Sequence, residues 1–72
     1  MEAGRLGQHL WFRDCDDIRH LVRIASIQMV CDADPAQDET VLFVANKQLR
    51  VPIPLDALMP MIDPAGRQKQ SR

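Results

Sequence analysis

The 72-residue chain has few residues of the types that build stacking surfaces and phosphate loops. It has no tyrosine, one tryptophan and two phenylalanines, which is too few aromatic rings for a large surface on which bases could stack. Its three glycines do not form a glycine-rich loop that could bind a phosphate. The sequence therefore lacks the usual signatures of a nucleotide-binding protein.

Cysteine and long apolar runs are also scarce. Cys15 and Cys31 do not have C-x-x-C spacing, and together with His9 and His20 they offer no pair of ligands at the close spacing of a zinc finger or ribbon. No apolar run approaches the roughly 20 residues needed to cross a bilayer, and the first residues lack the basic-then-apolar pattern of a signal peptide. We therefore expect a cytoplasmic protein with free thiols, no metal and no cofactor.

Residues that could support catalysis occur only singly. The acidic loop begins like a calcium-binding loop with Asp32 and Asp34, but Gln37 stands where that loop needs glycine and Phe43 where it needs glutamate. Cys15 lies among aspartates, whose negative charge raises the pKa of a thiol and makes it a poor nucleophile. We predict no catalytic residues, and hence a protein that is not an enzyme.

The chain does contain enough apolar sequence for one small core. Hydrophobic residues make up 46% and charged residues 26%, the balance of a folded domain. A core of this size has little stability to spare, so a second subunit often adds to it. We expect residues 1–8 to be flexible and residues 64–72 to form a disordered basic tail. Residues 9–63 then form a single β-rich domain with a net negative charge.

Short apolar segments separated by turn residues predict a mainly β fold. The stretch 9–12, followed by an aspartate-rich turn, predicts the first strand of one hairpin. The stretches 40–45 and 48–53 predict a second hairpin, joined by a tight turn at Asn46 and Lys47 in which asparagine tolerates positive φ. The expected fold is a small antiparallel sheet of about four to five short strands with a short C-terminal helix.

The segment 16–30 fits two structures. An aspartate precedes apolar residues at helical spacing, which predicts a helix and with it an α+β fold. The same residues also alternate as a strand, provided that a bulge or break near Ala25 and Ser26 changes the register. The residues of this segment alone leave both alternatives open.

The second hairpin indicates which residues pack in the core. Val51 and Ile53 share one face of the last strand, and the turn before it brings one face of the neighbouring strand against them. The predicted core is Ile24, Ile27, Val41, Phe43, Val51 and Ile53.

Pro52 and Pro54 occupy alternate positions at the end of the last strand. Proline cannot donate a ladder hydrogen bond, so these residues predict an edge strand. The following segment predicts a closing helix of one or two turns, which Pro60 either ends or restarts. So short a helix cannot bury both Met59 and Met61, and a methionine left outside is a candidate partner contact.

Two functions fit these features. The first is a small non-catalytic interaction module or regulator that binds another protein or a second copy of itself. Its predicted partner-binding residues are Trp11, Pro54, Met59 and Met61. The second is a nucleic-acid-binding regulator. Its predicted contacts are Arg13, Arg19, Arg23 and the basic tail. The negative charge of the predicted domain disfavours the second function, since nucleic-acid-binding proteins usually present a net basic face.

Several features between residues 10 and 62 follow one order: strand, turn, strand, a short isoleucine-containing segment, an acidic loop, two strands and a closing helix. They are Ile24, Ile27, Val30, Asp34-Pro35, Thr40, Asn46-Lys47, Val51, Leu55, Leu58 and Ile62. In this pattern the chain resembles the short flagellar-operon regulators of the FlbD type. The resemblance favours strands over a helix in the segment 16–30. It implies a small curled antiparallel sheet with a C-terminal helix and no particular function.

Overall fold

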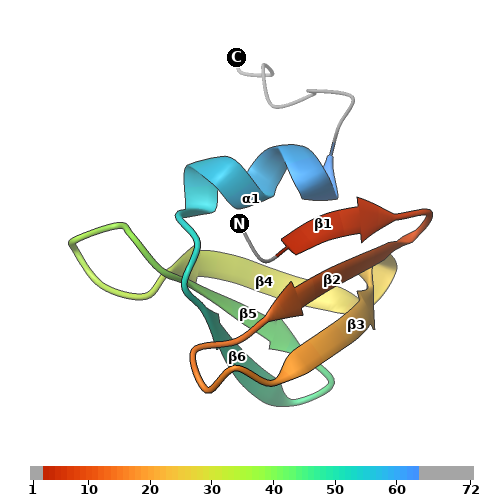
Figure 1. Cartoon of the computed structure of the whole chain (residues 1–72), viewed down its shortest axis with the longest axis horizontal. Coiled ribbons are helices and arrows are strands. Elements are labelled where there is room, and N and C mark those ends of the chain that lie inside the picture. Colours follow the sequence, from red (N-terminus) through yellow and green to blue (C-terminus); the bar gives the residue numbers. More distant parts are fainter. Residues whose placement is uncertain (1–2, 64–72) are drawn as a thin grey trace.

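The computed structural model describes residues 3–63, which form six short antiparallel strands and one α-helix (Figure 1). In chain order the elements are β1 (Ala3–Leu6), β2 (His9–Arg13), β3 (Arg19–Arg23), β4 (Ile27–Asp32), β5 (Thr40–Val44), β6 (Lys47–Val51) and α1 (Leu55–Ile62). The first three strands form one sheet, sheet A, and the last three form sheet B. The fold is mainly β with a C-terminal helix, as predicted, but it has two three-stranded sheets instead of one. No helix among residues 3–63 is long and apolar enough to cross a membrane.

A short 3-10 turn at Ile24–Ser26 carries the chain from sheet A to sheet B. The backbone N–H of Ile24 donates to the carbonyl oxygen of Gln8 at 3.0 Å, which ties this corner to the turn between β1 and β2. The predicted break near Ala25 is confirmed, and the alternative helix over residues 16–30 is wrong. Strand pairing prevails because β3 and β4 give backbone hydrogen-bonding partners to β2 and β5, which a helix cannot do.

The start of the chain differs from its prediction. Residues 3–6, which the sequence assigns to a flexible end, form β1 and pair with β2 along their whole length. Arg5 also joins this strand to α1, because its guanidinium donates to the carbonyl oxygens of Met61 and Ile62 at 3.1 and 2.8 Å. Carbonyls at a helix end lack partners within the helix, and a cation there complements the helix dipole. The predicted basic tail, residues 64–72, lies outside the described residues.

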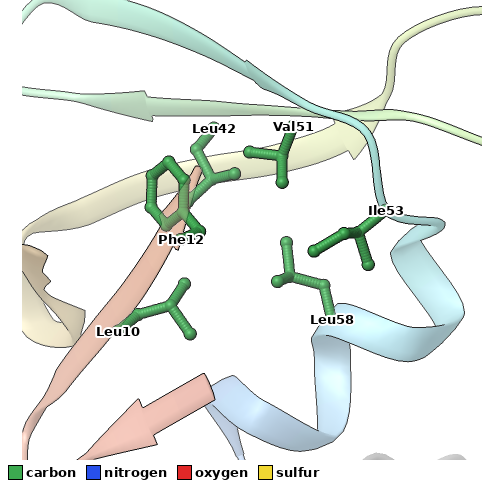
Figure 2. Packing of buried hydrophobic residues seen from close by; sticks show 6 residues of the cluster. All are labelled: Leu10, Phe12, Leu42, Val51, Ile53 and Leu58. Atoms are coloured by element: carbon green, nitrogen blue, oxygen red, sulfur yellow. The ribbon is translucent and has the colours of Figure 1, made fainter. Parts of the chain in front are cut away.

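The core lies between the two sheets, and α1 contacts β1 and β4 above it (Figure 1). In Figure 2 buried side chains from β2, β5, β6, the segment between β6 and α1, and α1 converge. They are Leu10, Phe12, Leu42, Val51, Ile53 and Leu58, each at most 3% exposed. The predicted core is confirmed for Val51 and Ile53, while Ile24 and Ile27 are half-buried and pack against its edge.

The inward face of β5 is the opposite of the predicted one. Leu42 is fully buried, whereas Val41 and Phe43 are only half-buried. Both faces of this strand are apolar, so alternation alone does not choose between them. Thr40, which is also fully buried, donates its hydroxyl to the carbonyl oxygen of Ile53 at 2.7 Å. This hydrogen bond allows the face with the hydroxyl group to lie inside.

The β5–β6 hairpin is confirmed, but its turn lies one residue earlier than predicted. Val44 pairs with Lys47, so the central turn residues are Ala45 and Asn46, with φ values of 51° and 64°. Two successive residues with positive φ are typical of the type I′ turn, whose twist matches that of the paired strands. Asparagine tolerates this backbone conformation better than alanine does.

β6 is an edge strand, as the prolines predict, because sheet B has the order β4, β5, β6. The strand ends at Val51, so Pro52 and Pro54 lie just beyond it. The outer edge of β6 is partly covered, since the backbone N–H of Cys15 donates to the carbonyl oxygen of Arg50 at 2.8 Å. The loop between β2 and β3 therefore holds the two sheets together at this edge.

α1 contains Pro60 and does not end there, so the alternative in which Pro60 ends the helix is wrong. A proline in the second turn removes one N–H donor, whose partner would be the carbonyl oxygen of Asp56. The next turn still closes, because the N–H of Asp63 donates to the carbonyl oxygen of Met59 at 3.0 Å. The two hydrogen bonds from Arg5 to the last carbonyls stabilise the end of the helix.

The register of β5 can be tested with two alanine substitutions. Leu42→Ala should lower the free energy of unfolding by about 2 to 5 kcal/mol, since it leaves a cavity in the closed core. Phe43→Ala should cost less, because Phe43 is only half-buried. Urea denaturation followed by circular dichroism measures both losses. A larger loss for Phe43→Ala would show that the other face of β5 is the inner one.

Candidate functional site

The structure does not gather the four predicted partner-binding residues in one place. Trp11, on β2, is 40% exposed on the outer side of sheet A. Pro54 is exposed just before α1, and Met59 is 45% exposed on the helix. Met61 is half-buried and packs against the core. The predicted residues therefore do not form one surface: Trp11 and Met59 lie on two separate surfaces, and Met61 is chiefly a packing residue.

The first surface is the outer side of sheet A, called here the sheet A face. Its side chains alternate along the strands with the buried Leu10 and Phe12. They are Leu6, His9, Trp11, Arg13, Arg19, Leu21 and Arg23. The sequence identifies Trp11 and the three arginines as candidates in two different hypotheses, and the strand register brings them onto one face. Leu6 and Leu21 were missed, because an isolated exposed leucine carries no local signal.

The register places apolar residues at the centre of this face. Trp11 lies directly opposite Leu21, which is 59% exposed. On one side of this pair Arg13 lies opposite Arg19, and on the other side the partner of Arg23 is a histidine. An exposed apolar pair is thus flanked at both ends by arginine.

The indole of Trp11 rests on Gly4, its partner on β1. A Cβ atom at Gly4 would lie 2.7 Å from Nε1 of the tryptophan, closer than real Cβ atoms approach their neighbours, and 3.0 Å from Cε2, which is tighter than usual. Only glycine therefore allows the indole to lie this close to the backbone of β1. The contact supports the ring from below while part of it stays accessible to solvent.

Arginines on this face differ in their partners. Arg13 forms an exposed ion pair with Asp17, with 3.3 Å between Nη1 and Oδ1. Within residues 3–63, neither Arg19 nor Arg23 forms an ion pair. Like charges directly opposite one another on antiparallel strands are unfavourable, and the ion pair of Arg13 with Asp17 offsets part of its repulsion with Arg19.

The turn beside this face is fixed by Asp14. One carboxylate oxygen accepts hydrogen bonds from the backbone N–H groups of Asp16 and Ile18 at 2.9 and 3.0 Å. The other lies 2.7 Å from Nε2 of His20, whose ring stacks on Phe12. The hydrogen bond with His20, followed by that from Ile18, lowers the pKa of Asp14. His20 therefore connects the turn to the core, a role its sequence context did not reveal.

The second surface is a hollow between α1 and β4, called here the α1–β4 groove. It has a volume of about 390 Å³. It is lined by Val30, Leu55, Asp56, Met59, Pro60, Ile62 and Asp63. Among residues 3–63, its lining combines apolar side chains with two carboxylates and includes no basic residue. Of the predicted partner-binding residues, Met59 alone lines this groove.

The cysteines give no support for a chemical site. Cys15 and Cys31 are free thiols, and residues 3–63 contain no group of three or more histidine, cysteine or acidic side chains arranged to hold a metal ion. Partial desolvation, followed by the negative charge of Glu39, raises the pKa of Cys15. The direction agrees with the sequence prediction, although desolvation is the larger cause. A thiol with a raised pKa is a weak nucleophile at neutral pH.

Gly4→Ala tests whether Gly4 sets the position of Trp11. The added methyl group should displace the indole, shift its emission to longer wavelength and increase its quenching by acrylamide, while the strands remain paired. The chain has a single tryptophan, so its fluorescence reports on this position alone. Leu6→Ala, on the same strand and face, is the control. Unchanged emission and quenching in Gly4→Ala would contradict the contact.

The Asp14 interaction predicts an acid-dependent loss of stability. The folded-state pKa of Asp14 lies below its ordinary value of 3.8, so its contribution is present above that value and is lost as the pH falls through the lowered pKa. Urea midpoints measured at neutral pH and near pH 3 should therefore differ less in Asp14→Asn than in the wild type. Asp38→Asn, in the loop between β4 and β5, should keep the wild-type difference. Equal pH dependence in all three proteins would refute the role of Asp14.

Comparisons of the chain with protein-family models, curated proteins and solved structures found no match. The resemblance to FlbD-type regulators therefore stays a prediction from sequence features. What the two surfaces bind has to be argued from their own geometry and charge.

Proposed function

We propose that the chain is a small non-catalytic docking module that binds another polypeptide through the sheet A face. The observation that carries this proposal is the exposed pair of Trp11 and Leu21 at the centre of the sheet, flanked by arginines at both ends. Tryptophan and arginine are enriched among the residues that dominate protein–protein binding energy. The complementary partner segment has apolar side chains at its centre and acidic ones around them.

The structural role of Trp11 does not account for the whole face. The packing of the indole on Gly4 explains the position of Trp11. It does not explain why Leu6 and Leu21 on the same face remain 63% and 59% exposed. Single exposed leucines are ordinary, but here two of them share one side of a three-stranded sheet with a tryptophan. An apolar patch with a charged rim is typical of an interaction surface.

The face is also preorganised for binding. Its side chains stand on paired strands, Gly4 supports the indole, and Asp14 fixes the adjoining turn. A tryptophan has only two side-chain torsions, so ordering it on binding costs little entropy. Binding to such a surface loses less free energy to side-chain ordering than binding to a mobile loop does.

Nucleic-acid binding is the second candidate, because Arg13, Arg19 and Arg23 do share one face and one base could stack on Trp11. The net charge of the described residues disfavours the binding of a long polyanion. Residues 3–63 contain six lysines and arginines against nine aspartates and glutamates, a net charge of −3. Three of those aspartates lie in the turn next to Arg13 and Arg19. A short acidic polypeptide segment confined to the sheet A face avoids this repulsion better than an extended phosphate backbone does.

Capture of polypeptides from an extract by the immobilised protein tests the docking function. Trp11→Ala and Leu21→Glu should weaken the capture of the specific partner by at least about 30-fold, as expected for loss of about 2 kcal/mol at a central contact. Gln48→Glu, an exposed position on sheet B, should retain it. Two-dimensional NMR spectra check that each variant stays folded. Equal capture by folded Trp11→Ala and the wild type would contradict the proposal.

A titration with single-stranded oligothymidylate tests the second candidate with the same protein. Docking of a polypeptide predicts no quenching of Trp11 fluorescence by the oligonucleotide. Quenching that weakens strongly between about 50 and about 200 mM salt would instead favour nucleic-acid binding and overturn the polypeptide proposal.

A further inference from the structure

β4 is an edge strand whose outer side lies along the α1–β4 groove. Sheet B has the order β4, β5, β6, so β4 pairs with a strand on one side only. Val30, in the middle of β4, is the residue that this strand contributes to the lining of the groove. α1 lies beside this edge, but a helix bonds its own backbone groups and cannot extend a ladder. Within residues 3–63, the outer edge of β4 therefore has no ladder partner.

The register of β4 shows which of its backbone groups point outward. In an antiparallel ladder, pairs that exchange hydrogen bonds alternate with pairs that do not. The N–H of Ala33 donates to the carbonyl oxygen of Glu39 at 2.9 Å, just beyond the last pair of the ladder. Counted back from this hydrogen bond, Val30 and Asp32 occupy positions that do not exchange hydrogen bonds with β5. Their N–H and C=O groups therefore point to the open edge.

The other hairpin of sheet B gives the same alternation. Its two-residue turn closes on the pair of Val44 and Lys47, which exchange hydrogen bonds in such a turn. Leu42, two residues before Val44, then bonds to β6, which leaves its partner on β4 facing outward. Three residues after Lys47, the carbonyl of Arg50 should also face outward. It does, because it accepts its hydrogen bond from the N–H of Cys15, outside the sheet.

β4 is also the least protected edge of the two sheets. β6 is followed by prolines and is partly covered by the loop between β2 and β3. β3 carries Arg19 and Arg23, and charged side chains on an edge discourage pairing. β1 is joined to α1 through Arg5. β4 contains no proline, lysine or arginine, and its register shift lies at its start, before Met29. An edge left open in this way is a site at which another strand can pair.

We propose that the α1–β4 groove binds an extended segment of another polypeptide, which adds to sheet B as an antiparallel strand beside β4. Outward N–H and C=O groups on alternate residues match the backbone of an extended chain, and strand addition at a sheet edge is a recurrent mode of peptide recognition. Val30 and Asp32 each donate one hydrogen bond to the segment and accept one from it. The site is separate from the sheet A face and does not depend on the docking proposed there.

The groove favours an apolar side chain at one position of this segment. Residues directly opposite one another in a ladder place their side chains on the same side of the sheet, so the residue opposite Val30 points into the groove. It meets Leu55, Met59 and Ile62 there. The groove volume of about 390 Å³ lies within the range of about 300 to 1,000 Å³ typical of ligand sites, which gives room for one or two side chains. Met59 is 45% exposed and can change rotamer to fit them.

A basic side chain fits the end of the groove near Asp32. Asp32 pairs with Thr40, whose hydroxyl binds the carbonyl of Ile53 just before α1. The first turn of the helix, which carries Asp56, therefore begins at this end of β4 (Figure 1). Within residues 3–63, neither Asp32 nor Asp56 forms an ion pair. In an antiparallel strand, the residue opposite Asp32 comes two positions before the apolar one. The preferred segment is lysine or arginine, then any residue, then an apolar residue.

NMR of the ¹⁵N-labelled chain with the blocked pentapeptide Thr-Lys-Thr-Val-Thr tests this site. In the free protein the N–H groups of Val30 and Asp32 should exchange rapidly with solvent, while those of Met29 and Cys31, which bond to β5, should exchange slowly. The peptide should shift the resonances of Val30 and Asp32 and slow their exchange. Thr-Glu-Thr-Val-Thr, and the first peptide N-methylated at its valine, should each bind at least about five-fold more weakly, since each loses one favourable contact.

Asp32→Pro and Asp32→Ala are a matched pair of variants. Both remove the carboxylate, but only proline removes the outward N–H, which β5 does not use. Asp32→Pro should bind the lysine peptide at least about three-fold more weakly than Asp32→Ala does, as expected for one hydrogen bond. Trp11→Ala should bind it like the wild type, because the sheet A face is a different surface. If Asp32→Pro does not fold, the N-methylated peptide tests the same kind of hydrogen bond on the wild type.

Three results would overturn the proposal. They are no binding of the lysine peptide, equal binding of its N-methylated form, and binding that leaves Val30 and Asp32 unperturbed. Slow exchange of both N–H groups in the free protein would also overturn it, since the edge would then already be paired. If that protection grew with protein concentration, the occupant would be a second copy of the chain.

Discussion

The alternation of side chains along β2 is the constraint on which both the core and the candidate site depend. Leu10 and Phe12 point inward and are almost completely buried, so Trp11 between them must point outward. A slip of one residue would turn Trp11 inward and move two core side chains into water, at a cost that a core of this size cannot offset. The same register that buries the core therefore presents the sheet A face.

The two ends of the described chain close the fold together. β1 and α1 are joined by Arg5, whose guanidinium binds the last helical carbonyls, and Leu58 anchors the helix in the core. Because α1 forms one wall of the α1–β4 groove, the groove exists only while this closure holds. The hydrogen bonds at the C-terminal end of α1 thus help to hold the wall of the α1–β4 groove in place.

The net charge of −1 for the whole chain hides two surfaces of opposite sign. The sheet A face carries arginines, while α1 contributes aspartates to the groove. Elsewhere opposite charges neutralise one another locally, as where Arg50 binds Glu39 and Asp34 on sheet B. Charges on an exposed surface favour some partners and exclude others, and so contribute more to specificity than to stability.

The sequence by itself determined the features whose cause is local. The aspartate-rich turn, the turn at Asn46 and the edge marked by Pro52 follow from backbone preferences of single residues or from proline's missing donor. With the alternation of apolar residues, these preferences predict a mainly β fold with a closing helix. They also placed Trp11 among the candidate binding residues.

Only the tertiary structure decided the features that depend on distant partners. The inner face of β5 carries Thr40, whose hydroxyl finds a partner in the distant carbonyl of Ile53, and the helix continues past Pro60 with its last carbonyls bound by Arg5. Trp11 lies beside Gly4 of β1 and Leu21 of β3 only because of the register in which the strands of sheet A pair. Pairing and packing of this kind join residues far apart in the chain, and local sequence patterns contain no information on which distant groups will meet.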